Sequence, residues 1–177
     1  TASKIRGYVD MIFEHIYKPV PVNRCETIAS SYNWSPPPPG TVMFFSDAAL
    51  FHDFNKSGAG VVALDHMGQC IKACTEVFSG SLTPEMAEAL ALRRAVDMAR
   101  EDNLFHVIFA TDCLSLVQRL KSKAHDRSVV GSVIDDIKMA TLGFSSVSFL
   151  HVRRQCNVLA HVLARSCFNS SGLCVFN

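Results

Sequence analysis

The feature that most constrains the fold is a short apolar run, "HVIFAT" at residues 106–111, which lies between segments with helical periodicity. A continuous apolar run of this length is typical of a strand that is buried on both faces of a sheet. The segment before it, residues 84–100, is strongly helical, with Thr83 at the N-cap position and Pro84 at the first helical position. A buried strand that is reached through a helix predicts an α/β fold.

The other strand-like segments indicate which kind of α/β fold this is. Three of them, residues 41–51, 57–65 and 69–78, are joined by short turns, which predicts an antiparallel meander. A further strand-like segment, residues 146–152, follows two short helical segments, and a last helix is predicted over residues 155–168. We therefore predict a five-stranded mixed sheet, three antiparallel strands followed by parallel strands, with helices on both faces.

Four consecutive prolines, at residues 36–39, mark a domain boundary. Such a run is stiff and extended and cannot join the interior of a sheet. We place a proline-rich linker at residues 34–40 and the main domain at residues 41–177. Residues 1–33 contain one amphipathic segment, "YVDMIFEHIYK", and are predicted to form an N-terminal helical extension.

Composition limits the classes of function. Hydrophobic residues make up 49% of the chain and the net charge is only +1, so nucleic-acid binding would have to come from local basic patches. The seven cysteines include no pair with zinc-finger spacing, so we expect reduced thiols and no zinc site. No apolar run approaches the ~18 residues of a membrane span. We expect an intracellular protein, of the nucleus or cytoplasm, that does not insert into a membrane.

Three acidic residues stand out by position. Asp47 closes the first strand, Glu88 heads the apolar stripe of the helix at residues 84–100, and Asp112 directly follows "HVIFAT". Each has an ordinary structural explanation: a turn residue for Asp47, a glutamate that reaches solvent for Glu88, and a helix N-cap for Asp112. However, a glutamate that faces inward is costly to bury unless it is paired or binds a metal.

The predicted topology brings these acids together. Asp47 lies on the first strand, Asp112 ends a strand that can lie parallel beside it, and Glu88 lies on the helix between them in the chain. Three converging carboxylates would repel one another strongly unless a cation lies among them. Hard oxygen ligands favour Mg²⁺ or Mn²⁺. Such clusters are used in phosphodiester hydrolysis, where two metal ions hold the attacking and leaving oxygens.

A histidine on the last predicted helix raises a separate question. In "QCNVLAHVLA", residues 155–164, Asn157 and His161 lie four residues apart and share a face away from the apolar stripe. From the residues alone, His161 is a metal ligand, a surface residue without a role, or the replacement of a carboxylate.

Five motifs follow one another in order: "WSPPPPG" leading into "FFSDAAL", then "GAGVVALDHMGQ", "TPEMAEALALRRAV", "FATDCLSLVQ" and "HVRRQCNVLAHVLA". Together they resemble the ribonuclease H-like domains of plant non-LTR retroelement reverse transcriptases and their stand-alone relatives. The resemblance runs from about Trp34 to the end of the chain. It implies the ribonuclease H-like fold and an endoribonuclease that hydrolyses the RNA strand of RNA–DNA hybrids with two Mg²⁺ or Mn²⁺ ions.

The resemblance also implies roles for individual residues. Asp47 matches an aspartate that bridges both metal ions, and Glu88 and Asp112 match ligands of the second ion. Thr83 matches a threonine that contacts a phosphate of the DNA strand, and Asn157 matches an asparagine of the last helix.

Three positions depart from the family pattern. His161 stands where the family has a fourth acid, which helps to hold the ion that activates the nucleophilic water. A neutral imidazole can bind a metal, but it brings no negative charge and prefers softer ions than Mg²⁺. Ala48 replaces the typical glycine after the first aspartate, and Cys113 replaces a common serine. These departures predict an activity that is weakened, shifted to another metal, or lost.

Basic residues are concentrated in two places, Arg119 with Lys121, Lys123 and Arg127, and Arg153 with Arg154. They either flank the acidic cleft and bind phosphates of an RNA–DNA hybrid or RNA, or form solvated ends of a helix and a loop. Three hypotheses stay open: an active hybrid ribonuclease, an inactive ribonuclease H-like module that binds nucleic acid or a protein partner, and an exonuclease or integrase-type member of the same broad fold.

Overall fold

The computed structural model describes Gly7 and residues 35–80, 82–124, 126–169 and 171–176. The helical extension predicted for residues 1–33 lies outside these residues apart from Gly7, so it stays a prediction, as do the domain boundaries. Within the predicted linker, residues 35–40 form neither helix nor strand, and Pro37 is buried. None of the helices in the described part of the chain combines the length and the hydropathy that a membrane crossing requires.

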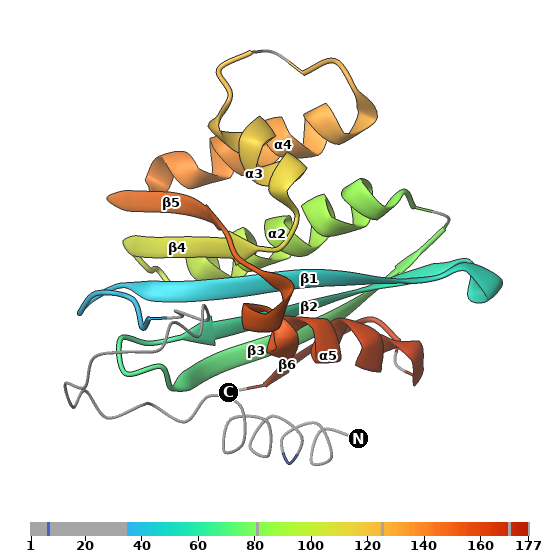
Figure 1. Cartoon of the computed structure of the whole chain (residues 1–177), viewed down its shortest axis with the longest axis horizontal. Coiled ribbons are helices and arrows are strands. Elements are labelled where there is room, and N and C mark those ends of the chain that lie inside the picture. The colour runs from blue at the N-terminus through green and yellow to red at the C-terminus, as the bar shows by residue number, and fades with distance from the viewer. Residues whose placement is uncertain (1–6, 8–34, 81, 125, 170, 177) are drawn as a thin grey trace, which may run out of the picture.

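One mixed sheet of six strands forms the centre of the described chain, in the spatial order β5-β4-β1-β2-β3-β6 (Figure 1). The antiparallel pairs are β1–β2, β2–β3 and β3–β6, whereas β4 pairs in parallel with both β1 and β5. The α/β class and the mixed sheet are therefore confirmed. The strands are β1 (Val42–Phe51), β2 (Lys56–Leu64), β3 (Cys70–Ser79), β4 (His106–Thr111), β5 (Ser146–His151) and β6 (Leu173–Phe176).

The sixth strand departs from the prediction of five. β6 follows Gly172, whose φ of +75° suits a glycine, and pairs with the outer edge of β3. It is only four residues long, which is too short for an alternating pattern to be read from the sequence. The other five strands follow one another along the chain in the predicted order, and β6 is added at the edge of the sheet.

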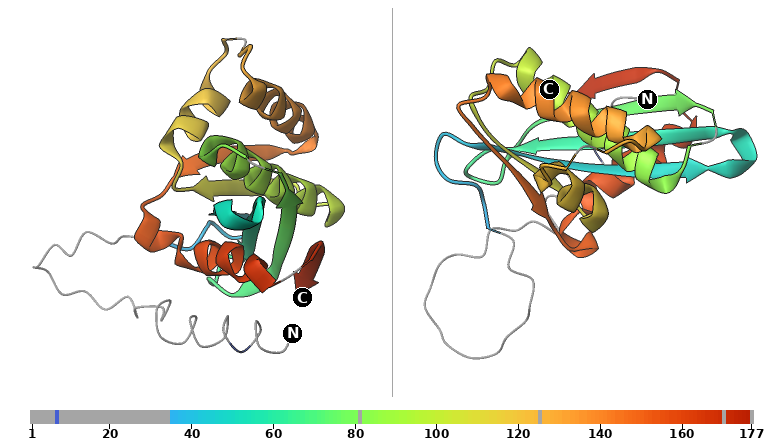
Figure 2. Two further views of the ribbon diagram at one scale, coloured as in Figure 1. Left: turned by 90° about the vertical axis from the view of Figure 1, so that its right-hand side faces the viewer. Right: turned by 90° about the horizontal axis from the view of Figure 1, so that it is seen from above.

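Helices cover both faces of the sheet, as predicted (Figure 2). Helices α2 and α4 lie on one side, where α3 joins them around a core that includes Phe44, Phe109 and Ile134. Helix α5 lies on the other side, over a second core that includes Phe45 and Val62. The helices are α2 (Pro84–Glu101), α3 (Leu114–Lys121), α4 (Val129–Ala140) and α5 (Val158–Ser166), with short 3₁₀ helices η1 (His52–Phe54), η2 (Thr141–Gly143), η3 (Arg154–Cys156) and η4 (Cys167–Asn169).

Helix α2 begins and packs as its sequence indicates. The Thr83 side chain accepts the Met86 N–H at 3.3 Å, and Pro84 is the first helical residue. Its buried face is built largely of small side chains: Ala87, Ala89, Ala91, Ala95 and Ala99. Small side chains let the helix axis lie close to the sheet, which brings the first turns of α2 near β1.

Helix α5 lies so close to β2 that two glycines are required there. A Cβ at Gly60 would lie 2.2 Å from the Ala160 carbonyl oxygen and 2.4 Å from the Ala164 nitrogen, and one at Gly58 would lie 2.6 Å from the Ala164 oxygen. Because these are backbone atoms of a helix, they cannot move aside without moving α5 itself. The glycines of β2 therefore set the distance between α5 and the sheet.

We predict that Gly60→Ala destabilises the protein by at least about 2 kcal/mol, because the added methyl group must push α5 away from the sheet. Gly143→Ala is the matched control, since a Cβ there meets no atom within 4 Å. Urea unfolding followed by circular dichroism measures both variants. Equal free energies of unfolding for Gly60→Ala and Gly143→Ala would contradict the close approach of α5.

Candidate metal centre

The parallel pairing of β1 and β4 brings two aspartates to the same level of the sheet. The last paired residues are Phe45 and Ala110, and Asp47 and Asp112 each lie two residues further along. Side chains two residues apart on a strand point to the same face, and Phe45 and Ala110 both face α5. The two aspartates therefore emerge side by side where β4 ends.

The ordinary explanations for these two aspartates do not hold. Asp47 does not close its strand, so that part of the prediction is wrong: β1 continues to Phe51, and Asp47 pairs with Gly60 of β2 and is 1% exposed. Asp112 is not a helix N-cap, because the N-cap of α3 is Cys113. Neither carboxylate has a turn or capping function that would explain its position.

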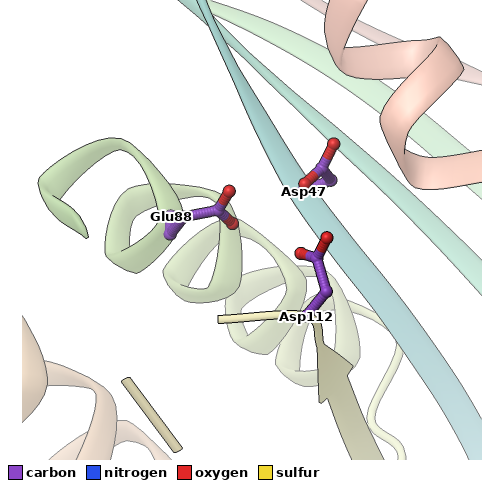
Figure 3. Close-up of side chains that lie close together, drawn as sticks. All are labelled: Asp47, Glu88 and Asp112. Atoms are coloured by element: carbon purple, nitrogen blue, oxygen red, sulfur yellow. The ribbon is translucent and has the colours of Figure 1, made fainter. Parts of the chain in front are cut away.

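The third carboxylate comes from α2, on the opposite face of the sheet. The Ala48 N–H lies just beyond the point where β1 loses its partner β4, and it donates to Glu88 Oε1 at 3.4 Å. Figure 3 shows the carboxylates of Asp47, Glu88 and Asp112 directed toward a common space. One oxygen from each lies within 4.8 Å of the other two. The three acids therefore lie together, as the topology inferred from the sequence predicts.

The electrostatics of the cluster follow from this crowding. Burial, followed by the charges of Asp47 and Asp112, raises the pKa of Glu88 to about 9. Burial also raises the pKa of Asp47, against the lowering effect of its hydrogen bond with His161. Without a cation, Glu88 therefore holds a proton at neutral pH.

The donor set fits a hard divalent cation. Carboxylate oxygens are the ligands that Mg²⁺ and Mn²⁺ prefer. Glu88 Oε2 is buried, and no described atom forms a hydrogen bond with it. An ionised oxygen in that position would be satisfied by a cation, so we expect Asp47, Glu88 and Asp112 to be the ligands.

His161 contacts the cluster directly. Its Nδ1 lies 2.6 Å from Asp47 Oδ2, and its side chain is 25% exposed. His161 is therefore not an isolated surface residue. Whether it binds a metal or only replaces a carboxylate stays a prediction.

Asn157 fixes the start of α5 to β1. It is buried at the N-cap position of α5, and its side chain and that of His161 both reach the pair of aspartates. Its Nδ2 donates to the Ser46 carbonyl oxygen at 2.9 Å and lies 3.4 Å from Asp112 Oδ1. The main-chain carbonyl oxygen of Asn157 accepts the main-chain N–H of His161 at 3.1 Å. Asn157 thereby positions both Asp112 and the helix that carries His161.

Arg154, in η3, brings a positive charge to the same place. Its Nη1 lies 3.7 Å from Asp112 Oδ2, and its Nη2 lies 3.3 Å and 3.4 Å from the two ring nitrogens of His161. Arg154 and His161 thus lie against the two aspartates on the side of α5.

A cleft of about 300 Å³ lies beside the cluster, with Glu88 and His161 among its lining residues. Three nitrogen-bearing side chains line it, Arg154, His161 and Arg165, and small or apolar residues line much of the rest: Ala48, Ala49, Leu50, Phe51, Pro84 and Ala87. Arg165 was not among the predicted site residues. It lies four residues after His161, a helical spacing that could have indicated a shared face.

Comparison with protein families matches residues 45–167 to the family described as reverse transcriptase-like. These residues make up more than half of the chain and include the three acids, Asn157 and His161. The chain belongs to the reverse transcriptase-like family. The predicted resemblance to ribonuclease H-like domains is confirmed by this match together with the structures below, although none of them tests a plant origin.

Solved structures of ribonucleases H share the fold of this reverse transcriptase-like chain. RNase H1 from the halophilic archaeon Halobacterium salinarum has a TM-score of 0.68 at 20% identity, covering 75% of this chain and 100% of that one. LC11-RNase H1, isolated from compost and solved with an RNA/DNA hybrid, has a TM-score of 0.62 at 21% identity, covering 71% and 94%.

A reverse transcriptase gives a similar result. The foamy viral protease-reverse transcriptase, also solved with an RNA/DNA hybrid, has a TM-score of 0.63 at 18% identity, covering 84% of this chain and 23% of that one. At these identities the likeness shows the fold alone. No curated protein sequence matches the chain.

Most of the other predicted nucleic-acid contacts lie outside the acidic cluster. Thr83 is exposed at the start of α2, Lys121 is exposed at the end of α3, and Lys123 is exposed two residues beyond it. Arg153 lines a separate hollow beside the proline segment. The nucleic-acid contacts of these four residues stay predictions.

Arg119 is engaged in an ion-pair network. Its guanidinium binds Glu85 Oε2 at 2.6 Å and also binds Asp126 and the Ser128 hydroxyl. The network connects α2, α3 and the loop before α4. Its hydrogen bonds lower the pKa of Glu85, and those of Asp126 with Ser128 and Arg119 lower the pKa of Asp126 to about 2. Arg119 thus has a structural function, while its phosphate contact stays a prediction.

We predict that Arg119→Gln lowers stability at neutral pH and that this loss disappears in acid. Glu85 and Asp126 bind protons less tightly in the folded state, so their stabilisation is complete above the unfolded pKa of ~4. It is lost as the pH falls toward the folded value of about 2. Urea unfolding at a series of pH values measures the difference from wild type, with the exposed Arg127→Gln as control. A difference that stays constant down to the acid limit would contradict the network.

Proposed function

We propose that this chain is a ribonuclease H-type endoribonuclease that binds RNA–DNA hybrids and hydrolyses the RNA strand with the help of divalent metal. One observation carries the proposal: Asp47, Glu88 and Asp112 converge, with one oxygen from each within 4.8 Å of the others. This convergence occurs in a fold shared with ribonucleases H. The shared fold alone would not support this activity, because proteins of one fold have many different activities.

The three carboxylates would hold Mg²⁺ or Mn²⁺. When bound, such a metal supplies charge stabilisation at phosphoryl oxygens and makes water a better nucleophile. Asp47 is fixed within β1 and Asp112 at the end of β4, so both ligands come from elements whose backbones are held by the sheet. Asn157 restrains Asp112 through its side-chain amide. Ligands held this firmly cost little reorganisation during the reaction.

The cations of the cleft would bind nucleic-acid phosphates. Arg154 and Arg165 line the cleft beside Glu88, and arginine forks match phosphate geometry well. The hybrid complexes of LC11-RNase H1 and of the foamy viral enzyme support an RNA–DNA hybrid as the substrate class. Contacts to the backbone and 2′-hydroxyls, instead of base edges, would give the selectivity.

His161 and Arg154 reduce the activity that we expect. His161 brings no negative charge of its own and engages Asp47, while Arg154 lies close to Asp112. Both therefore reduce the negative charge available to a metal ion. We propose that the enzyme cleaves more slowly than a ribonuclease H whose site has four acids.

The sequence motifs further suggest that the chain descends from plant non-LTR retroelements. We propose that it acts in the nucleus or cytoplasm, where RNA–DNA hybrids occur.

The same two contacts favour a second candidate function. A domain whose aspartates are already paired with its own basic residues can bind nucleic acid, or a protein partner, without turnover. Binding of a hybrid in the absence of any cleavage distinguishes this module from the enzyme.

We predict that the purified protein cleaves the labelled RNA strand of an RNA–DNA hybrid in Mg²⁺ or Mn²⁺, because Asp47, Glu88 and Asp112 offer the oxygen ligands that both ions prefer. The cleavage rate of Asp47→Asn should fall by more than roughly 10–100-fold, which is the loss expected when a residue that only supports a metal ligand is removed. Asp97→Asn, an acid on the same α2 helix as Glu88 but absent from the metal cluster, should cleave like wild type. If Asp47→Asn cleaves as fast as wild type, the nuclease is a contaminant and the proposed activity fails.

We predict that His161→Asp raises the Mg²⁺-dependent cleavage rate by about tenfold or more, because a fourth carboxylate replaces a side chain that brings no negative charge. Initial rates in Mg²⁺ and in Mn²⁺ measure the change, with hybrid affinity determined separately in EDTA. A variant that turns a silent wild-type protein into an active one would identify the natural chain as the inactive module. Unchanged rates in both metals would show that position 161 does not limit catalysis.

A further inference from the structure

The side of the acidic cluster that faces η3 and α5 is occupied by the chain's own basic residues. His161 Nδ1 engages Asp47 Oδ2 at 2.6 Å, and Arg154 Nη1 lies 3.7 Å from Asp112 Oδ2. The two bases also contact each other at 3.3 Å and 3.4 Å. His161 therefore engages one oxygen of Asp47. Both oxygens of Asp112 have a nitrogen partner, because Asn157 Nδ2 lies 3.4 Å from Oδ1 and Arg154 lies beside Oδ2.

The side of the cluster that faces α2 differs. Glu88 Oε2 is buried, and within the described chain no group donates a hydrogen bond to it. One ligand oxygen each from Glu88, Asp47 and Asp112 lie within 4.8 Å of one another. These three oxygens can bind one cation. The groups that approach from η3 and α5 carry nitrogen, and they repel a cation or donate hydrogen bonds to the acids.

The charges agree with this asymmetry. The family pattern of four acids and two divalent ions balances −4 against +4. Here the three ionised acids contribute −3 and Arg154 contributes +1, which leaves −2. A single divalent ion balances that charge, whereas two ions would leave the site with an excess of +2 before substrate binds.

We infer that this chain binds one divalent cation, between Asp47, Glu88 and Asp112, and that His161 and Arg154 take the place that a second cation would need. The inference rests on the proposed metal-dependent function. Arg154 and His161 are then positioning residues: His161 holds one oxygen of Asp47, and Arg154 supplies a positive charge beside Asp112.

The test is the number of ions bound per chain. Mn²⁺ is titrated into the purified full chain, and free Mn²⁺ is measured by its electron paramagnetic resonance signal; calorimetry with Mg²⁺ gives an independent count. We expect one site in the wild type and two in Arg154→Gln/His161→Asp. Arg165→Gln, which removes a cation from the same cleft but leaves both contacts with the aspartates, should retain one site. Circular dichroism confirms that each variant is folded.

The possible counts have distinct meanings. Two ions in the wild type would overturn the inference and leave the proposed function intact. No ion at millimolar Mn²⁺ would overturn both. One ion in the wild type and still one in the folded double variant would overturn the assignment of His161 and Arg154 to the second position. Because the wild-type count needs no variant, the inference can be tested even if the double variant does not fold.

Discussion

Repulsion among three carboxylates confined to one small space is the interaction on which this site depends. The sheet imposes it: the β1–β4 pairing sets Asp47 level with Asp112, and the alanine-rich face of α2 brings Glu88 against the same point. Such crowding is costly unless the charge is neutralised. The protein neutralises it with a proton on Glu88, whose pKa is raised to about 9, and with nitrogen groups beside both aspartates. A bound cation would replace the proton.

Helix α5 links the stability of the fold to the composition of the site. Gly58 and Gly60 let it lie directly on β2, and Asn157 fixes its first turn to the Ser46 carbonyl. The same helix carries His161 to Asp47. A change in how α5 packs would therefore alter the hydrogen bond at Asp47, so the chemistry of the acids depends on contacts that lie outside the cluster.

Much of this arrangement can be predicted from the sequence because it follows from local patterns. The run "HVIFAT" predicts a buried strand, Thr83 and Pro84 predict the start of α2, and a glutamate on an apolar stripe indicates a buried charge. The errors have physical causes. Asp47 resembles the end of a strand, because the pairing with Gly60 that extends β1 is a tertiary contact. β6 is too short to show alternation, and the approach of Arg154 to Asp112 depends on the turn at η3. Arg165 was not predicted, because its helical spacing from His161 does not by itself show that this face of the helix lines the cleft.

Anomalous scattering of Mn²⁺, in crystals of the full chain soaked with that ion, shows whether Asp47, Glu88 and Asp112 form a cation site. A bound ion would give a peak about 2.1 Å from oxygens of these three residues, the distance typical of small hard divalent ions. No peak among these three residues at saturating Mn²⁺, with the side chains arranged as described, would contradict the presence of this site.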